Sequence, residues 1–307
     1  MQRLTDAILD CVVYLYPSES AARGGKATGG SGFLIGTPLR EPVRAEEYPE
    51  VTRTPTNSEA RTFPVHVYAV TNAHVIEGGN TCIRAMAAAG MLVLPTDPLH
   101  WTSHQDEDDV AVFHMGIHDA FHDFRVLGPV YLLNRALMTR LEIGLGDEIV
   151  SVGRLISHDG KQRNQPAVRF GHLSMMPGEP VAVRRERPRR RLVKQESFLV
   201  DGRSMGGYSG SPVLVWKPPG ELAGQPNARQ RIWQTTKQEW WLLGISWGYL
   251  FERWPVIDKK TWEPIVGMMI EATSGGMMGV VPCWKLISLL NQPSLVEQRA
   301  KKERAHG

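Results

Sequence analysis

Short apolar runs recur along the chain, and turn-forming residues separate them. The runs CVVYLY at 11–16, VHVYAVT at 65–71 and DVAVFHM at 109–115 are rich in β-branched and aromatic residues, and Gly, Pro, Asn or Asp stands near their ends. Comparable runs follow at 148–153, 168–174, 197–202, 211–216, 240–248 and 279–282. Runs of this length and composition predict strands, and their number predicts an all-β barrel or sandwich.

One segment near the end has helical spacing instead. The run CWKLISLL at 283–290 places Trp284 and Ile287, with Leu290 close by, on one face of a predicted helix. We expect this helix to break near Pro293, since proline cannot continue it. Residues 293–307 then form a polar tail, and its last residues, EQRAKKERAHG at 297–307, are predicted to be frayed and solvated.

Three segments depart from the strand pattern. Residues 37–63 and 217–238 are polar and contain Pro or Gly, and they predict long surface loops. Residues 184–194, RRERPRRRLVK, form a basic stretch. The simplest interpretation of this stretch is a flexible basic loop. A nucleic-acid patch, a dock for an acidic partner and a cleavage site remain as alternatives.

Composition narrows the class of protein. The chain has 307 residues, of which 42% are apolar and 22% charged, as expected for a globular protein with its own core. A net charge of +3 is too small to indicate a nucleic-acid or membrane partner for the whole chain. Three cysteines, an odd number without a pairing pattern, favour a reducing compartment. The first apolar stretch is interrupted by Asp10 and has no cleavage-site pattern behind it, so we expect a cytoplasmic protein without a signal peptide.

The stretch GGYSGSP at 206–212 contains a candidate nucleophile, Ser209. Gly207 allows the backbone to turn so that its own N–H and that of Ser209 can point to one spot, as a developing oxyanion requires. The stretch is not the nucleophile elbow of α/β-hydrolases, because Ser211 stands where that motif has its second glycine and a strand-like run follows.

A serine nucleophile needs a base, and His74 is the best candidate among ten histidines. It follows an apolar strand in YAVTNAHVI, where a short turn would present the imidazole. His114, His118 and His122 have the spacing of one helical face and suggest a metal site, but Gly116 and the strand-like run before it disfavour a helix. The other histidines, which we expect to be ordinary polar residues, include His66, His100, His104, His158 and His172.

The base in turn needs an orienting carboxylate. In QDEDDVAVFHM, Asp109 is the last acid before the apolar strand, so it is best placed to turn inward while its neighbours remain in water. Asp108 is the reserve candidate, and a wholly solvated acidic turn is the plainer alternative.

Taken together, TNAHV, DVAV and GYSGSP, in the order His, Asp, Ser, resemble the trypsin-like (chymotrypsin-fold) serine peptidases. The closest resemblance is to their bacterial Deg/HtrA-like and glutamyl-endopeptidase-like branch, since GGSGFLIG at 29–36 and GISWG at 244–248 are similar to strands of that branch. Only 25 residues follow Pro282, whereas Deg-type members usually add a C-terminal peptide-binding domain, so we expect the peptidase domain to stand alone. The chain departs from digestive members because Tyr208 stands where they carry an activation aspartate.

The resemblance implies two six-stranded β-barrels with the site between them, long inserted loops and a final helix. Residues 1–125 would form the first barrel with His74 and Asp109. Residues 126–292 would form the second barrel with Ser209 and the final helix, and 293–307 would be the tail. His74 would be the general base, Asp109 its partner and Ser209 the nucleophile. The amides of Gly207 and Ser209 would form the oxyanion hole.

Further residues follow from the resemblance by their offset from these motifs. Substrate-binding positions would include Arg203, Ser204, Ser246, Trp247, Gly248 and Gly279. Ser246 would also support the buried carboxylate with a hydroxyl hydrogen bond. If Arg203 points into the primary pocket, an acidic residue before the cut bond is favoured, and if it points outward, the pocket is small and neutral.

The expected activity is therefore hydrolysis of peptide bonds in protein or peptide substrates, without a metal or cofactor. Control would come from the loops of the chain or from a regulatory protein partner. The alternative is a catalytically silent chymotrypsin-fold protein that binds a partner or serves as a scaffold.

Overall fold

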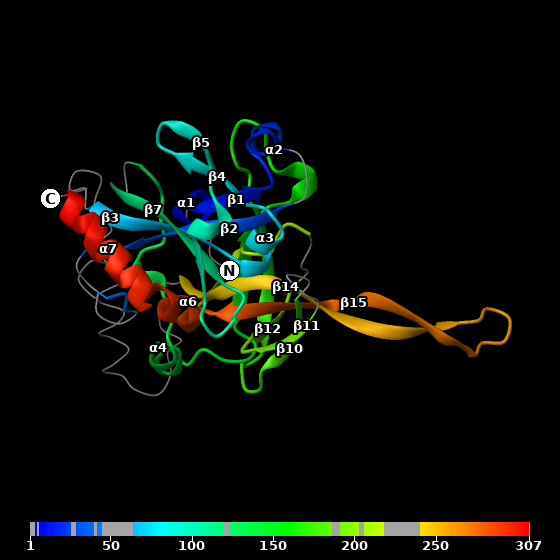
Figure 1. The fold of residues 1–307 in the computed structure, drawn as a ribbon. Coiled ribbons are helices and arrows are strands. Elements are labelled where there is room, and N and C mark those ends of the chain that lie inside the picture. Colours follow the sequence, from blue (N-terminus) through cyan, green and yellow to red (C-terminus); the bar gives the residue numbers. More distant parts are fainter. Residues whose placement is uncertain are drawn as a thin grey trace.

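The chain folds into an antiparallel sheet followed by a closed barrel (Figure 1). The computed structural model describes residues 4, 6–25, 29–39, 42–44, 64–119, 123–185, 191–202, 206–217 and 240–306. Most of the two predicted surface loops and the centre of the basic stretch, residues 186–190, lie outside the described residues.

The first half of the chain forms a seven-stranded sheet in the order β5-β4-β1-β2-β3-β7-β6. Every neighbouring pair in it is antiparallel. Alternate residues of β1 belong to different clusters of buried side chains, Tyr14 to one and Leu15 to the other. Burial on both faces explains the continuous apolar run of this strand. The strands are β1 (Val12–Tyr16), β2 (Gly30–Thr37), β3 (Pro64–Thr71), β4 (Cys82–Ala87), β5 (Gly90–Pro95), β6 (Trp101–Ser103) and β7 (Ala111–Asp119).

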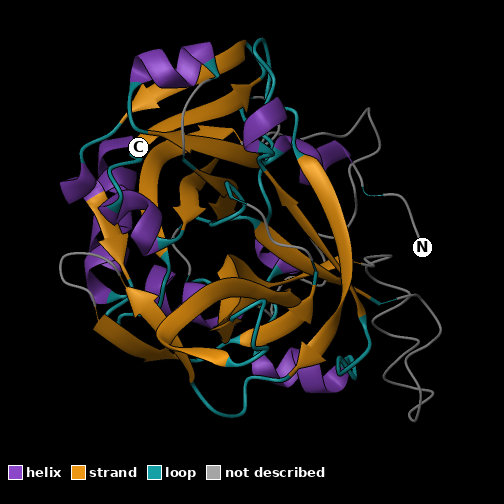
Figure 2. Ribbon diagram, turned by 90° about the vertical axis from the view of Figure 1, so that its right-hand side faces the viewer, coloured by secondary structure: helices purple, strands orange, loops and turns teal. Residues whose placement is uncertain are grey.

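The second half forms a closed barrel in the order β12-β15-β14-β13-β8-β9. Figure 2 shows the sheet above and the curved strands of the barrel below. A separate two-stranded hairpin pairs β10 (Val181–Arg185) with β11 (Arg191–Gln195), so the basic stretch begins and ends in strands. The barrel strands are β8 (Glu148–Gly153), β9 (Ala167–Met175), β12 (Phe198–Asp201), β13 (Pro212–Trp216), β14 (Trp240–Ile257) and β15 (Pro264–Pro282).

These strands confirm the predicted all-β fold class of the chymotrypsin type. The C-terminal half has the six strands expected of a barrel. In the N-terminal half, the described strands form an open sheet rather than a closed barrel, with β5 and β6 at its two edges.

The helices are short except at the end of the chain. They are α1 (Asp6–Asp10), α2 (Glu19–Gly24), α3 (Ala73–Glu77), α4 (Arg135–Arg140), α6 (Cys283–Leu290) and α7 (Pro293–His306), with single 3-10 turns η1 (Pro98–His100), η2 (Pro129–Tyr131) and η3 (Ile156–His158). The predicted helix 283–290 is confirmed. Its buried face is Leu286, Leu289 and Leu290, whereas Trp284 and Ile287 are only half-buried. Of the helices described, none is both long and apolar enough to span a membrane.

The prediction of a frayed end at 297–307 is wrong. Residues 293–306 form α7, and Leu295 and Arg299 are buried within it. The guanidinium of Arg299 donates to the Tyr68 hydroxyl on β3 at 3.2 Å and to the Leu290 carbonyl at 2.7 Å. The buried leucine and the anchored arginine fix a helix whose remaining side chains are mostly exposed.

A buried histidine pair lies beneath the same helix. His66 Nδ1 is 3.0 Å from His114 Nε2, and His66 Nε2 is 2.8 Å from Glu303 Oε1 on α7. Burial lowers the pKa of His114 to about 3, and the charges of Lys302 and Arg299 act in the same direction. Burial also lowers the pKa of His66, although Glu303 opposes that shift. The prediction of an ordinary polar position was therefore wrong for His66.

Two fully buried arginines join the sheet to the barrel. Arg154 follows β8, and its Nε and Nη2 lie 2.9 and 2.8 Å from Asp159 Oδ2, which also accepts from the Tyr16 hydroxyl. Arg84 on β4 donates to the carbonyls of residues 22, 159 and 160 and to the Asn164 side chain. The charges are thus matched by a carboxylate and by carbonyl dipoles, which makes their burial tolerable.

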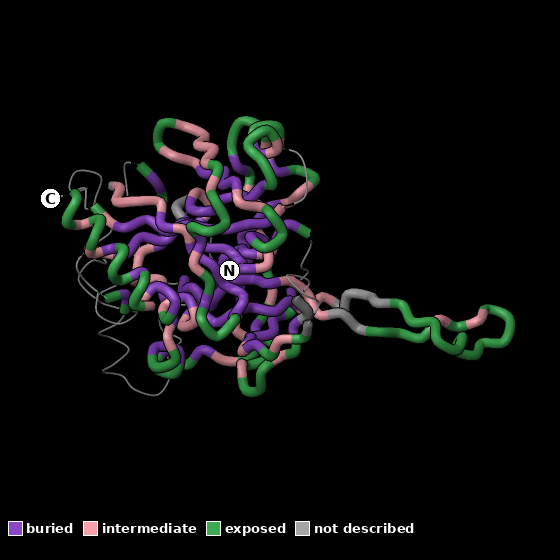
Figure 3. Tube along the Cα trace, in the orientation of Figure 1, coloured by how far each residue is buried: buried purple, intermediate pink, exposed green. Residues whose placement is uncertain are grey.

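Strands β14 and β15 extend beyond the barrel as a two-stranded arm (Figures 1 and 3). Their pairing continues from Gly244↔Pro282 in the barrel to Ile257↔Pro264 near the tip. The sequence predicted strands at 240–248 and 279–282 and missed the continuous ribbon between them.

Candidate active site

The three predicted catalytic residues, His74, Asp109 and Ser209, lie close to the ends of strands, two in the sheet and one in the barrel. His74 is in α3, which begins directly after β3, and Asp109 lies just before β7, the sheet neighbour of β3. Ser209 lies just before β13 of the barrel. Asn72 joins the first two loops, since its Nδ2 donates to the Asp109 carbonyl at 2.6 Å.

His74 and Asp109 form a close pair. The imidazole Nδ1 is 2.6 Å from Asp109 Oδ2, and the His74 backbone N–H donates to the other carboxylate oxygen at 3.0 Å. The Asp109 side chain is 1% exposed and that of His74 is 37% exposed. Because an ionised carboxylate only accepts hydrogen bonds, Nδ1 must carry the proton and Nε2 is left as the basic nitrogen.

The reserve carboxylate, Asp108, faces a different set of partners. Its Oδ2 lies 3.1 Å from His104 Nδ1 and 2.9 Å from the Lys285 ammonium on α6. Burial raises the pKa of Asp108, but the hydrogen bonds from His104 and Lys285 outweigh it and hold the pKa below its usual range. Asp109, rather than Asp108, is therefore the carboxylate that orients His74.

Ser31 on β2 holds the loop that carries Ser209. The Ser31 N–H donates to the Ser209 carbonyl at 2.8 Å, and the Ser31 hydroxyl donates to the Gly207 carbonyl at 2.6 Å. From the barrel side, the Gly210 N–H donates to the Ser246 carbonyl at 2.8 Å. The sheet and the barrel thus fix the loop from both sides.

Two glycines of this loop are required by its conformation. Gly207 has φ +95° and Gly210 has φ +89°, both in the region that favours glycine. A Cβ on Gly210 would lie 2.0 Å from the Ser31 carbonyl oxygen and 2.3 Å from the Thr71 hydroxyl. The loop therefore approaches the sheet more closely than any side chain would permit.

The same close approach brings Ser209 beside α3, the helix that contains His74. A Cβ on Gly30 would lie 2.8 Å from the Val75 methyls and 3.0 Å from the Ser209 carbonyl oxygen. The residue after His74 and the backbone of Ser209 thus lie against the same glycine. Ser209 is half-buried, and its hydroxyl lies 3.5 Å from the Trp247 carbonyl, at the outer limit of a hydrogen bond.

Tyr208 anchors the loop inside the barrel. Its side chain is fully buried, its hydroxyl donates to the Ala167 carbonyl on β9 at 3.0 Å, and the Arg169 guanidinium lies 4.9 Å from its ring centroid. Burial raises the pKa of Tyr208, partly offset by Arg169. The sequence marked this position only as a departure from the family, because the partners lie about forty residues earlier in the chain.

The predicted substrate-binding positions are only partly described. Arg203 and Ser204 lie outside the described residues. Trp247 packs on Gly279, where a Cβ would lie 2.1 Å from its ring carbons, and Gly248 is the neighbour of Gly279 in the β14–β15 ladder. The Ser246 hydroxyl is buried without a hydrogen-bond partner among the described residues, so the hydrogen bond predicted from Ser246 to the carboxylate is not formed.

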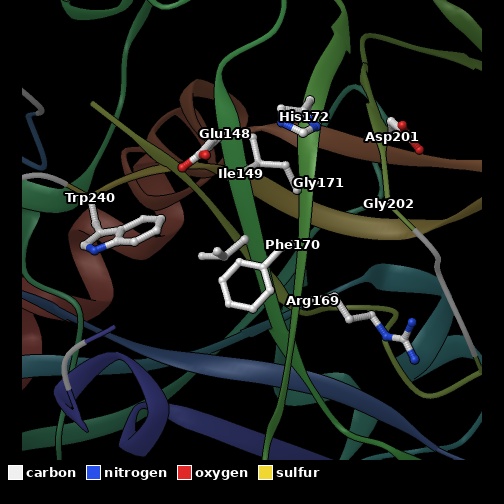
Figure 4. A pocket seen from close by; sticks show the side chains of 10 residues that line it. Glu148, Ile149, Arg169, Phe170, Gly171, His172, Asp201, Gly202 and Trp240 are labelled. Atoms are coloured by element: carbon white, nitrogen blue, oxygen red, sulfur yellow. The ribbon is translucent and has the colours of Figure 1, made fainter. Parts of the chain in front are cut away.

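A cavity of about 520 Å³ lies elsewhere, against β8 and β9 (Figure 4). Its lining includes Glu148, Ile149, Phe170, Asp201 and Trp240, and none of the predicted site residues belongs to it. Arg169, which also lines it, connects it to the nucleophile loop through Tyr208.

The metal site suggested by the histidine spacing is not supported by the described part of the chain. His114 is on a strand and contacts His66, and His122 lies outside the described residues. A different group, His104, Asp106 and Asp108, has ligand atoms within 4.8 Å of one another. The Lys285 ammonium already lies 2.9 Å from Asp108, so a cation at this group would meet a positive charge.

Comparison with known proteins adds a distant structural likeness. No family model matches the chain, and no curated protein sequence matches it. Among solved structures, the apo MamO protease domain from Magnetospirillum magneticum is 14% identical with a TM-score of 0.45, covering 94% of this chain and all of that one. The active form of the Rv3671c protease from M. tuberculosis is 14% identical with a TM-score of 0.42, covering 93% of this chain and 81% of that one. These values are too low to assign the chain to a family.

Proposed function

We propose that the chain is a serine endopeptidase that acts through an acyl-enzyme. The observation that carries the proposal is the 2.6 Å contact between His74 Nδ1 and the buried Asp109 carboxylate, next to a loop that presents Ser209 between two positive-φ glycines. A buried carboxylate that fixes the tautomer of a half-exposed imidazole is what a general base requires.

In this proposal each group has one task. His74 Nε2 accepts the proton of the Ser209 hydroxyl while Ser209 Oγ attacks the carbonyl carbon of the substrate, and it then returns the proton to the leaving amine. Asp109 stabilises the imidazolium. The amides of Gly207 and Ser209 stabilise the oxyanion, and within the described residues neither donates to a backbone carbonyl. Water then hydrolyses the acyl-enzyme by the same route in reverse.

The substrate class in this proposal is an extended peptide that pairs with the backbone of 246–248. The Trp247 indole would support this region from beneath, because it is buried against Gly279 and donates to the Ser197 hydroxyl at 3.1 Å. If Arg203 faces the substrate, we propose that the enzyme prefers an acidic residue before the cut bond. If Arg203 faces away, we propose that it prefers a small neutral residue there.

One observation favours a second candidate, a binding protein or scaffold without catalysis. The Ser209 hydroxyl is 3.5 Å from the Trp247 carbonyl. A hydroxyl that donates its proton to this carbonyl does not donate it to the imidazole of His74, so it is not activated as a nucleophile. In that case, a bound partner or substrate would have to turn the side chain before hydrolysis could begin.

Substrate profiling with a peptide library tests the proposed activity and its specificity together. The wild type is expected to cleave internal peptide bonds, and Ser209→Ala is expected to cleave none. Ser211→Ala is the matched control, because Ser211 lies two residues away, is buried and has a hydroxyl that finds no hydrogen-bond partner among the described residues. Cleavage that persists in Ser209→Ala would refute the proposal, and binding of peptides without cleavage by the wild type would favour the scaffold.

A further inference from the structure

The arm formed by β14 and β15 carries an unusual number of exposed apolar side chains. Between residues 254 and 270, the large apolar residues that are 36–99% exposed are Trp254, Ile257, Trp262, Ile265, Val266, Met268, Met269 and Ile270. Figure 3 shows the outer part of the arm as almost wholly exposed. Scattered apolar residues are normal on a surface, but a contiguous group of this size marks a contact site.

Both faces of the arm are apolar. Trp254 lies opposite Ile270 in the ladder, and the next pair, Pro255 and Met269, points to the other face. Each face of a two-stranded ribbon nine residues long is about 300 Å², so the two faces together approach what one partner contributes to a stable interface. A flat partner would cover only one face, whereas a cavity or cleft would enclose the tip.

The arm is poorly suited to insertion into a membrane. Within the described residues, the outer edges of β14 and β15 beyond the barrel pair with no further strand. Their outward N–H and C=O groups would have no partner in lipid, where each such group costs several kcal/mol. The arm therefore suits a protein partner that offers polar groups along with an apolar surface.

The tip of the arm combines an aromatic ring with two lysines and two acidic residues, Asp258 and Glu263. Asp258 accepts from the backbone N–H groups of Lys260 and Thr261, and this turn holds the tip in shape. Trp262 is 81% exposed, and Lys259 and Lys260 are exposed beside it. The tip thus presents an indole and two ammonium groups on a short, structured turn.

The cavity against β8 and β9 offers an aromatic surface and carboxylates that an indole and a lysine can contact (Figure 4). Its volume of about 520 Å³ is sufficient for a large side chain, and its lining includes Phe170, which is 51% exposed, and Trp240. It also includes two carboxylates, Glu148 and Asp201, and one guanidinium, Arg169. One oxygen of Glu148 is buried without a hydrogen-bond partner in the described part of the chain.

We propose that the arm tip of one copy, residues 258–263, docks into the β8–β9 cavity of a second copy of this chain. Trp262 enters the space beside Phe170, and Lys259 or Lys260 pairs with Glu148. The arm extends away from its own barrel, so its own body does not cover the tip (Figure 1). A chain that carries both the projection and the cavity that fits it can self-associate.

The docking site adjoins the candidate active site without belonging to it. Arg169 lines the cavity and lies over the Tyr208 ring, one residue before Ser209. The proposed contact does not depend on the proposed hydrolysis, and its test measures association rather than activity.

Disulfide trapping tests the contact directly. The three native cysteines are buried, so introduced cysteines will be the reactive ones. Trp262→Cys mixed with Phe170→Cys is expected to give a covalently linked pair of chains under mild oxidation. Trp262→Cys mixed with Leu99→Cys is the control, because Leu99 is 88% exposed and lies outside the cavity. Equal yields in the two mixtures, or no linked pair in either, would overturn the proposal.

Sedimentation of the full chain gives an independent measure. The wild type is expected to self-associate, and Trp262→Ala and Glu148→Lys are each expected to weaken the association constant about tenfold or more. Mixing Glu148→Lys with a variant in which Lys259 and Lys260 are both changed to Glu is expected to restore association. A wild type that stays monomeric at about 100 μM would refute the contact. So would a monomer that binds phosphatidylcholine–phosphatidylglycerol vesicles through Trp262, because the arm would then serve a membrane.

Discussion

Among the groups that hold the Ser209 loop, the hydroxyl of Ser31 is the most informative one to remove. Ser31 is fully buried, donates to the Gly207 carbonyl at 2.6 Å and accepts from the Arg154 N–H at 2.8 Å. Ser31→Ala removes both of these hydrogen bonds, and the loss of a buried hydrogen-bond partner costs about 1–3 kcal/mol for each group. We therefore expect a loss of about 2–4 kcal/mol in the free energy of unfolding, which a domain with about 5–15 kcal/mol survives.

The same change is expected to act on Ser209. Without the hydroxyl, the peptide between Gly207 and Tyr208 is no longer fixed, and a displacement of about 1 Å in a reacting group can reduce a rate about 100-fold. The assays are chemical denaturation and the second-order rate constant for modification of Ser209 by a fluorophosphonate. We expect that rate constant to fall about 10–100-fold while the variant remains folded.

Ser151→Ala is the matched control for this prediction. Ser151 is 1% exposed on β8 and its hydroxyl has no hydrogen-bond partner among the described residues, so the same truncation should be nearly neutral. If Ser31→Ala loses no more stability than Ser151→Ala, the two hydrogen bonds are not important. If stability falls and the modification rate does not, Ser31 supports the fold but does not position the loop.

Three further predictions concern the surroundings of the site. Asp159→Ala removes the carboxylate beside Arg154 and disturbs the turn that accepts from Arg84, so the free energy of unfolding should fall by about 3–5 kcal/mol in denaturant titrations; an unchanged midpoint would contradict this. His114 has a pKa of about 3 in the folded chain and therefore takes up a proton on unfolding between pH 6.5 and 3, so the free energy of unfolding should fall as the pH drops through this range. The slope for this residue is at most about 1.4 kcal/mol per pH unit. His114→Gln should flatten the dependence of the unfolding free energy on pH between those values. Tyr208→Phe loses one buried hydrogen bond and should cost about 1 kcal/mol, whereas an unaltered thermal midpoint would show that the ring alone anchors the loop.

The sequence was informative where a short pattern determines a local structure. Apolar runs such as that of β1 identified most of the strands, because both faces of that strand are buried and the run has no polar interruption. The positions of His74 and Asp109 followed from the same rule, since each stands where an apolar strand meets a turn. Their proximity in the structure results from the pairing of β3 with β7.

What could not be predicted depends on partners distant in the chain. Arg299 looked like part of a solvated tail because nothing in the local sequence indicates Tyr68, which lies 231 residues earlier. The role of Tyr208 depends on Arg169 in another strand, and burial of Arg84 depends on a loop that follows β8. The arm was missed because nothing local in the sequence shows that β14 and β15 continue to pair with each other beyond the barrel.

The most direct test of the central claim is covalent labelling of the folded chain with a fluorophosphonate, followed by mass spectrometry of the modified peptide. The account predicts a single adduct on Ser209, absent from Ser209→Ala, retained in Ser211→Ala and formed far more slowly in His74→Ala, since the imidazole activates the hydroxyl. A folded wild type that acquires no adduct, or an adduct that persists in Ser209→Ala, would contradict it.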